Sequence, residues 1–341
     1  MKEAYSLRSD REPAPNRLFF AIIITYLAVS AVFTAFSMAG QPLRLPTVLN
    51  LISGELTLLV PALIYLVLTR TNVRRVSERW GLPLAAVPLL VLLAYCILPL
   101  ISLINLGSMI LGGENAAASL GGTVARLPLW LSLLCVSILP GIVEEFIFRG
   151  LLYGTYRKRG AWKAVLVSAL LFGLMHMNLN QFCYAFVMGI IFALLYEATG
   201  SLTAPILVHA VYNGNSVLVM HGTADAADIA GAQEMLLGML SDGGLRTQLL
   251  ITVLILAVTA LVGLAAAGGL YVAIVKLCRR EKQVGILFAG TSDRKIAVFR
   301  QRQGKAEGEE ISRRIWGPFL IAGTAVSVLA ILGRALLLQL A

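Results

Sequence analysis

The hydrophobic residues of this chain are gathered into nine long runs, which short polar segments separate. A helix needs about 20 mainly apolar residues to cross the roughly 30 Å hydrocarbon core of a bilayer. The runs therefore predict an all-α, polytopic transmembrane helix bundle with about eight to nine spans. Their bounds are 18–38, 48–69, 82–110, 127–153, 163–177, 182–198, 202–220, 249–275 and 315–340.

The fifth and sixth runs are shorter than a full span, and only the four residues 178–181 join them. Such spacing predicts a tight helical hairpin that neighbouring helices partly shelter from lipid. No small-residue cleavage site follows the first run, which we expect to be a retained membrane helix and not a signal peptide.

Composition supports a membrane protein. Hydrophobic residues make up 58% of the 341 residues and charged residues 13%, whereas soluble domains have about 45–50% and roughly 25%. No soluble core could hide this much apolar surface, and disordered, coiled-coil, collagen-like and disulfide-rich classes are excluded as well. The four cysteines show no metal-binding spacing and are expected to be small buried hydrophobes.

The net charge of +10 is explained by topology. If the N-terminus is cytoplasmic and nine spans alternate, 23 of the 28 Lys and Arg residues fall on the cytoplasmic side. This asymmetry follows the positive-inside rule. We find no nucleic-acid-binding module, so the expected partner of the basic segments is the lipid bilayer, and the expected location is a prokaryotic plasma membrane.

Topology also predicts how the chain is divided. We expect a cytoplasmic tail, N-terminal membrane helices, a core with the polar residues described below, an extracytoplasmic loop and C-terminal membrane helices. The last part includes a basic cytoplasmic stretch at 276–314. The five parts cover residues 1–17, 18–126, 127–220, 221–248 and 249–341.

Ionisable side chains inside membrane spans are costly and mark functional sites. The chain has three histidines, and two of them lie in such spans. The polar residues of the core are Glu144, Glu145 and Arg149 in the fourth run, His176 in the fifth, and His209 and Asn213 in the seventh. Glu55 in the second run has no evident partner and is expected near a membrane interface.

Helix geometry separates the roles of the two adjacent glutamates. Glu145 and Arg149 are four residues apart, so they share a face and are predicted to form a structural ion pair. Glu144 points about 100° away and lacks that partner. Glu144 and His176 each lie thirteen residues from a basic anchor, or roughly 20 Å along a helix. Three helices therefore bring polar groups to overlapping depths.

These residue types suit the hydrolysis of a peptide bond, which needs a base, a proton donor and hydrogen-bond donors for the oxyanion. In one arrangement Glu144 and His176 activate water while His209 and Asn213 stabilise the oxyanion. In another, Glu144, His176 and His209 are ligands of a catalytic zinc. The sequence leaves both open. A proton-coupled transporter is a further alternative, although the polar residues reach only about mid-depth.

Three motifs occur in order along the core: EExxxR at 144–149, FxxxH at 172–176 and HxxxN at 209–213. Together they resemble the CPBP family, also called the Abi or CAAX-protease-and-bacteriocin-processing family, which includes the type II CAAX prenyl endopeptidases. The resemblance covers about residues 127–220. It implies an intramembrane endopeptidase, often regarded as a metalloprotease, that acts on a membrane-embedded or lipidated peptide or protein.

The resemblance also assigns roles to individual residues. Glu144 and His176 would activate the water, and His209 and Asn213 would form the oxyanion site. Glu145 and Arg149 would hold the site together, and a zinc ion remains an open possibility. A non-catalytic bacteriocin-immunity or partner-binding protein of the same family is the main alternative.

Overall fold

The computed structural model describes residues 14–71, 81–112, 121–222, 238, 243–288 and 315–340. All regular elements of these residues are helical, which confirms the all-α class. The first helices are α2 (Ala14–Met38), α3 (Thr47–Thr69) and α5 (Ala86–Gly112). The core helices that follow the fourth run's helix are α10 (Ala161–Leu174), α11 (Leu179–Thr199) and α12 (Thr203–Gly222), and the last are α14 (Gly243–Leu277), α15 (Glu281–Phe288) and α17 (Pro318–Leu340).

Each of the nine apolar runs coincides with helical structure, and seven helices of the described chain are long and apolar enough to cross a membrane. Two core helices differ. The helix α10 has only 14 residues, and α12 is long enough but is not among the seven. Polar residues in the middle of α12, including His209 and Asn213, lower its hydropathy.

The fourth run forms one continuous helical rod of changing pitch. It consists of α7 (Leu129–Ser132), η2 (Leu133–Ile138), α8 (Leu139–Glu145), η3 (Phe146–Tyr153), α9 (Gly154–Tyr156) and η4 (Arg157–Arg159). Both η2 and η3 are π-helical, with the wider turns that often occur at functional sites. Pro140 begins α8 and has no N–H to donate. The helix continues through Pro140, while the wider turns lie on either side of α8.

The α10–α11 hairpin confirms one prediction and corrects another. The two helices pack closely, as expected. However, α10 ends at Leu174 and α11 already begins at Leu179, so the turn comprises 175–178 and shares only Asn178 with the expected linker. The reason is local capping: the Asn178 side chain accepts a hydrogen bond from the Gln181 N–H, which favours a helix start at this point. Met177 supplies the turn with a left-handed backbone conformation (φ 51°).

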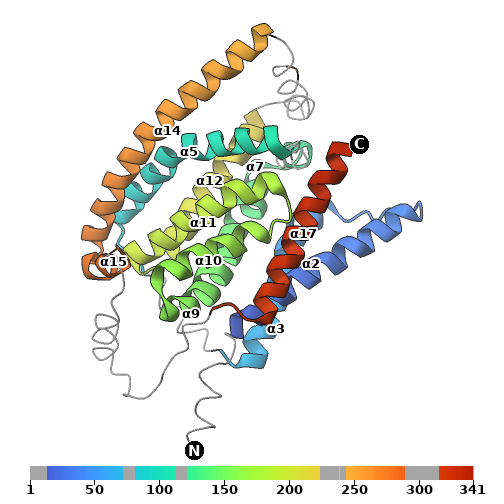
Figure 1. Ribbon diagram of the computed structural model, residues 1–341, viewed down its shortest axis with the longest axis horizontal. Coiled ribbons are helices and arrows are strands. Elements are labelled where there is room, and N and C mark those ends of the chain that lie inside the picture. The colour runs from blue at the N-terminus through green and yellow to red at the C-terminus, as the bar shows by residue number, and fades with distance from the viewer. Residues whose placement is uncertain are drawn as a thin grey trace, which may run out of the picture.

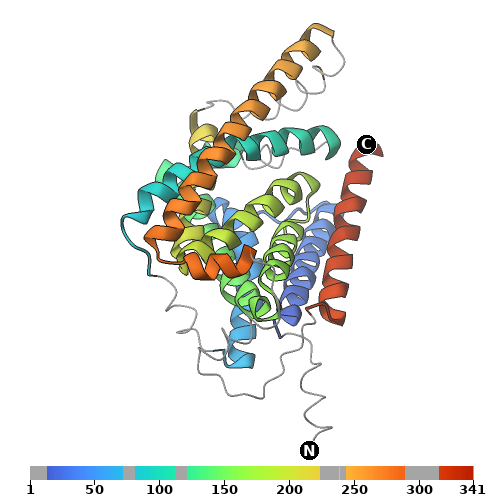
Figure 2. The ribbon, with the colours of Figure 1, turned by 60° about the vertical axis from the view of Figure 1, so that its left-hand side comes forward.

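The helices are arranged as a central group between two flanking groups (Figures 1 and 2). The central group consists of α10, α11, α12 and the rod of the fourth run. On one side α5 packs along α14, and on the other α17 packs against α2. Because α11 contacts α5, α10, α12 and α14, it lies at the middle of the bundle.

Three segments that the sequence assigns to one side of the membrane meet at one end of the bundle. The Asn16 side chain donates to the backbone carbonyl of Ile315 and accepts from the Tyr156 hydroxyl, at 2.9 and 2.7 Å. This contact places the start of α2, the end of the fourth run's helix and the start of α17 together. The remainder of the predicted tail, most of the loop predicted at 221–248 and the part of the basic stretch at 289–314 lie outside the described residues.

Candidate active site

Two consecutive glutamates at the end of α8 point to different neighbours. Glu144 is 6% exposed and Glu145 is fully buried. Arg149, one turn later in η3, donates from its guanidinium to Glu145 Oε1 at 3.0 Å. The predicted i,i+4 ion pair is therefore confirmed. Because the two glutamates point about 100° apart, Glu144 is directed away from the guanidinium group.

The buried Arg149 side chain is satisfied by more than its ion pair. A second guanidinium nitrogen donates to the carbonyl of Gly189 in α11, also at 3.0 Å. The guanidinium carbon lies 4.4 Å from the ring centre of Phe172 and 5.1 Å from that of Phe192. A Cβ at Gly189 would lie 2.8 Å from the Cα of Ala169. Glycine thus allows α10 and α11 to approach closely where the carbonyl meets the arginine.

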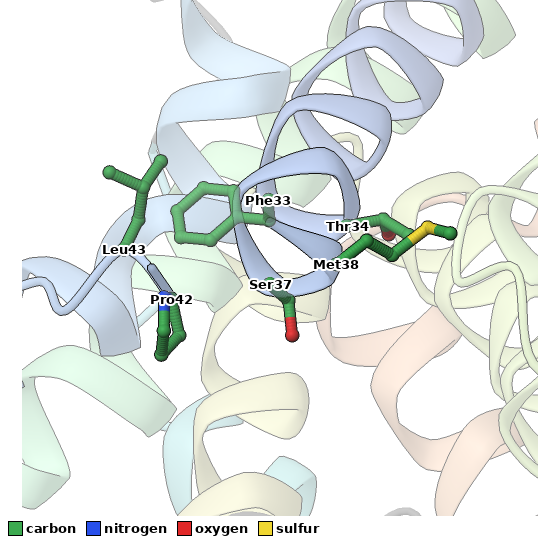
Figure 3. Close-up of a pocket in the computed structure, with 6 residues that line it drawn as sticks. All are labelled: Phe33, Thr34, Ser37, Met38, Pro42 and Leu43. Carbon is green, nitrogen blue, oxygen red and sulfur yellow. The ribbon is translucent and has the colours of Figure 1, made fainter. Parts of the chain in front are cut away.

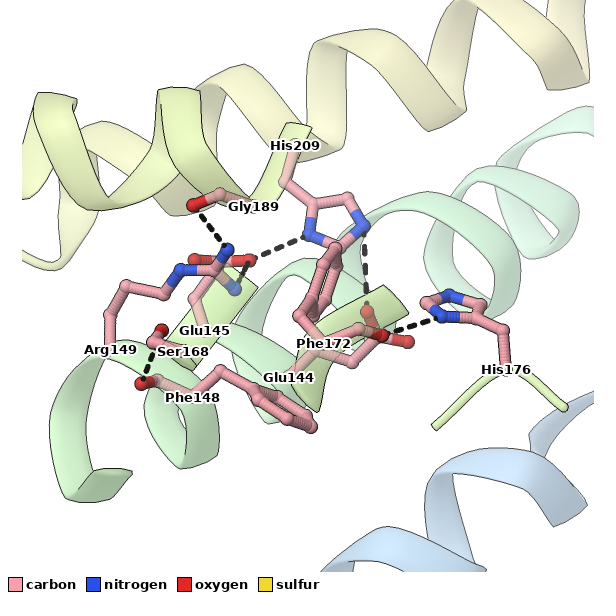
Figure 4. Close-up of polar contacts among 9 residues, drawn as sticks. All are labelled: Glu144, Glu145, Phe148, Arg149, Ser168, Phe172, His176, Gly189 and His209. Atoms are coloured by element: carbon pink, nitrogen blue, oxygen red, sulfur yellow. Dashed lines mark hydrogen bonds and ion pairs between the residues drawn. The ribbon is translucent and has the colours of Figure 1, made fainter. Parts of the chain in front are cut away.

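His209 of α12 lies between the two carboxylates (Figure 4). Its Nδ1 is 3.1 Å from Glu145 Oε1, and its Nε2 is 3.9 Å from Glu144 Oε2. A carboxylate only accepts hydrogen bonds, so Nδ1 carries a proton and donates it to Glu145. The imidazole also stacks on Phe192, with ring centres 5.0 Å apart and planes at 16°. These contacts fix the ring so that Nε2 faces Glu144.

His176 approaches the same region from the end of α10. Its Nδ1 lies 2.9 Å from the carbonyl oxygen of Phe172, which can only accept, so Nδ1 donates. In a neutral imidazole this leaves Nε2 free to accept a hydrogen bond. The Phe172 ring packs edge-on against both imidazoles, with centres 5.3 Å from His176 and 6.0 Å from His209. Figure 4 shows both histidines directed toward the region of Glu144 and Phe172.

Asn213 lies one turn after His209 on α12, as the sequence predicted. Its amide nitrogen donates to the backbone carbonyl of Val136 in η2 at 3.2 Å. Nearby, the Ser137 hydroxyl donates to the Ala210 carbonyl at 2.6 Å, so two side chains tie η2 to α12. Because an amide nitrogen has two hydrogens, one of them remains for another acceptor.

The predicted residues do not fit a catalytic zinc. The described part of the chain has no group of three His, Cys, Asp or Glu side chains that could hold a metal ion. Zinc ligands in proteins lie about 2.0–2.3 Å from the metal, so the donor atoms must converge on one point. In the set Glu144, His176 and His209, both histidines use Nδ1 for contacts within the protein, so Nε2 is the nitrogen of each ring that could bind a metal.

Several atoms of the site have no hydrogen-bond partner among the described residues. They are Oε2 of Glu144, Oε2 of Glu145 and Nε of Arg149, all of them buried. An unpaired buried polar atom costs free energy, which a reactive centre can tolerate when a substrate or water completes it. A separate cavity of about 400 Å³ lies at the far end of α2 (Figure 3), where none of the site residues lines it.

Sequence reasoning did not identify three features of the site. The contact of His209 with Glu145, the stacking of Phe192 and the Gly189 carbonyl all depend on packing between helices. Phe172 is the first residue of the motif FxxxH, but the sequence alone assigned it no role. In the sequence, the only signal was the glycine itself, because small residues in membrane helices allow two helices to approach closely.

Fold and comparisons together define an integral membrane protein with a segment that is similar to CAAX proteases. Residues 126–214 match the family described as Type II CAAX prenyl endopeptidase Rce1-like. The match covers all three motifs, and the resemblance that they indicated is thereby confirmed over this segment.

Two curated relatives are each similar to part of the chain. One is "Putative membrane peptidase YdiL" of Bacillus subtilis (strain 168), 35% identical over 101 residues, which are 29% of this chain and 40% of that protein. The other is "Membrane-embedded CAAX protease MroQ" of Staphylococcus aureus (strain USA300), 34% identical over 90 residues, 24% of this chain and 36% of that protein. The chain thus spans less than half the length of either relative. No solved structure matches significantly.

Proposed function

We propose that this protein is an intramembrane endopeptidase of the CAAX type, which hydrolyses a peptide bond in a membrane-associated peptide or protein. One observation carries the proposal. Within the segment that matches the family, Glu144 is buried with an unpaired Oε2 that faces the Nε2 of His209, 3.9 Å away. A buried carboxylate oxygen without a hydrogen-bond partner costs free energy and is best explained by a role as a base.

The reaction begins with a water molecule held by Glu144 and His176. Glu144 accepts a proton from the water, and the hydroxide attacks the carbonyl carbon of the scissile peptide bond. The proton then passes from Glu144 to the leaving amine as the carbon–nitrogen bond breaks. His176 accepts a hydrogen bond through Nε2 and orients the water, since its Nδ1 is held by the Phe172 carbonyl.

The oxyanion of the tetrahedral intermediate is stabilised by His209 and Asn213. For His209 Nε2 to donate, the ring must carry protons on both nitrogens. The carboxylate of Glu145 accepts from Nδ1 at 3.1 Å and so orients the ring, much as the buried aspartate of a catalytic triad holds its imidazole. Glu145 and Arg149 therefore position His209 and do not touch the substrate.

The substrate class follows from the location of the site and from the relatives. The site lies among helices apolar enough to cross a membrane, so the scissile bond belongs to a peptide that can enter the bilayer, such as a lipidated tail. The names of the family and of MroQ refer to CAAX proteins, which makes prenylated C-terminal peptides the first substrates to test. The asymmetry of basic residues supports a cytoplasmic N-terminus.

The test uses purified protein in lipid nanodiscs with a library of membrane-inserted and prenylated peptides, and mass spectrometry identifies the products. We expect cleavage by the parent protein, with one oxygen of isotopically labelled water in each new carboxyl group. His176→Ala should abolish cleavage, whereas Glu281→Gln, an exposed change on α15, should not. Specific binding of a peptide without any cleavage would contradict the proposal and favour a non-catalytic binding protein.

A further inference from the structure

A cluster of buried polar side chains joins α5 to the start of α11. Asn180 is 1% exposed, and its amide nitrogen donates to Asn105 Oδ1 and to the Ser108 hydroxyl oxygen, at 2.9 Å each. The Ser108 hydroxyl in turn donates to the Asn105 carbonyl, also at 2.9 Å. Asn105 and Ser108 belong to α5, which lies outside the segment that matches the family. We call these three residues the α5–α11 polar cluster.

The α5–α11 polar cluster is more specific than close packing requires. Apolar side chains could also pack α5 against α11, and hydrogen bonds between membrane helices contribute only modestly to stability. Hydrogen bonds are directional, however, and both amide hydrogens of Asn180 are used in them. A satisfied buried network specifies one arrangement of the groups that it joins. The cluster therefore fixes the start of α11 relative to α5.

The turn between α10 and α11 carries His176 and depends on its surroundings. Met177 has a φ of 51°, in the left-handed region that residues with a side chain rarely adopt. The His176 N–H donates to the Gly173 carbonyl over a long 3.3 Å. A strained backbone of this kind persists only where the neighbouring structure holds it. The position of His176 is thus set from outside the turn.

Two contacts connect this turn to the start of α11. The Asn178 side chain accepts from the Gln181 N–H at 2.9 Å and caps the helix. A Cβ at Gly173 would lie 3.0 Å from the Phe182 ring and 3.1 Å from the Phe182 carbonyl oxygen. The end of α10 therefore lies directly against the first turn of α11. A shift of that first turn relative to α5 would move the turn before it, and His176 with it.

We propose that Asn180 is a positioning residue for His176, which it holds in place through its hydrogen bonds to Asn105 and Ser108 of α5. This role rests on the proposed peptidase function. The α5–α11 polar cluster holds the start of α11, and the start of α11 holds the turn. The Nε2 of His176 then stays directed toward the water that Glu144 activates. The cluster itself takes no part in proton transfer.

The first test measures kcat and KM for one cleaved peptide with the parent, Asn180→Leu and Tyr153→Phe. Leucine has a similar volume but cannot donate to either partner. We expect kcat to fall about ten- to 100-fold, the effect of a small misplacement of a catalytic group, with KM nearly unchanged. Tyr153→Phe is the matched control, because it removes a buried hydrogen bond to Glu197 at the other end of α11. It should leave kcat and KM as in the parent.

Thermal unfolding of both variants separates positioning from stability. A kcat of Asn180→Leu no lower than that of Tyr153→Phe would overturn the proposal, whatever the two melting temperatures are. If Asn180→Leu does not fold, Ser108→Ala replaces it. This variant removes one of the two acceptors of Asn180 and should lower kcat by a smaller factor, again with KM nearly unchanged. An unchanged kcat in Ser108→Ala would then overturn the proposal.

The second test does not depend on activity. Solid-state NMR of the protein in lipid, with ¹⁵N-labelled histidine, follows the Nδ1 atoms of its three histidines, and His176→Ala identifies one of them. The His176 Nδ1–H that donates to Phe172 should give one narrow signal in the parent and in Tyr153→Phe. In Asn180→Leu it should broaden or split, while the His209 signal stays unchanged.

The two tests fail in different ways. An unchanged His176 signal in Asn180→Leu would refute the positioning role even in an active peptidase. A broadened signal in a protein that cleaves nothing would uphold the hold of Asn180 on His176 and refute only the peptidase function.

Discussion

Replacing Arg149 by methionine tests how the site is held together. The guanidinium is fully buried, donates to Glu145 Oε1 and to the Gly189 carbonyl at 3.0 Å each, and stacks on two phenylalanine rings. Methionine fills much of the same volume but removes the charge. The Glu145 carboxylate is then buried with His209 as its only partner among the groups described here.

The expected magnitude follows from these contacts. Breaking a buried ion pair by removing one partner costs about 3–5 kcal/mol, because a buried charge is left uncompensated. The lost cation–π contacts overlap with this cost and do not add fully to it. We expect Arg149→Met to lower the free energy of unfolding by about 4 kcal/mol, which is close to a thousandfold change in the folding equilibrium.

The assay is equilibrium unfolding in mixed micelles of the parent and three variants. The double variant Arg149→Met/Glu145→Gln should recover at least half of the lost stability, because it removes the uncompensated carboxylate as well. Arg44→Met, at an exposed position between α2 and α3, should be neutral. The reasoning is refuted if Arg149→Met is no less stable than Arg44→Met, or if the double variant is as unstable as the single one.

Four other substitutions or treatments have defined outcomes. Asn213→Leu should lower kcat by roughly 100- to 1000-fold, as expected for a lost oxyanion donor, while the lost hydrogen bond to the Val136 carbonyl should lower the free energy of unfolding by only about 1 kcal/mol. Gly189→Val should destabilise the protein by about 1–3 kcal/mol through overpacking against Ala169, whereas Gly268→Val, which meets no neighbour within 4 Å, should cost less; unfolding in micelles compares the two. Tyr153→Phe should cost about 1 kcal/mol in the same assay, because its hydroxyl donates to the buried Glu197 at 2.7 Å. Dialysis against a chelator should leave peptide cleavage intact, because the mechanism uses only protein groups; lost cleavage that only zinc restores would contradict it.

Contacts within one helix were predictable from the sequence. The pair Glu145–Arg149 was expected because residues four apart share a helix face, and it forms at 3.0 Å. The isolation of Glu144 from Arg149 follows from the same geometry. The helical class and the approximate bounds of the nine helices also followed from the apolar runs, because a bilayer requires long apolar segments.

Contacts between helices were not predictable in the same way. The position of His209 between two carboxylates depends on how α12 packs against α8, and a single sequence does not contain that packing angle. The early start of α11 depends on one side-chain cap at Asn178.

The most direct test of the central claim is the cleavage rate of one identified peptide by the parent protein and by Glu144→Gln in matched nanodiscs. Glutamine keeps the shape of the side chain but cannot accept a proton from water. The account predicts a rate at least 100-fold lower, the usual contribution of a general base, in a variant that unfolds like the parent. A rate within a few-fold of the parent would show that Glu144 is not the base.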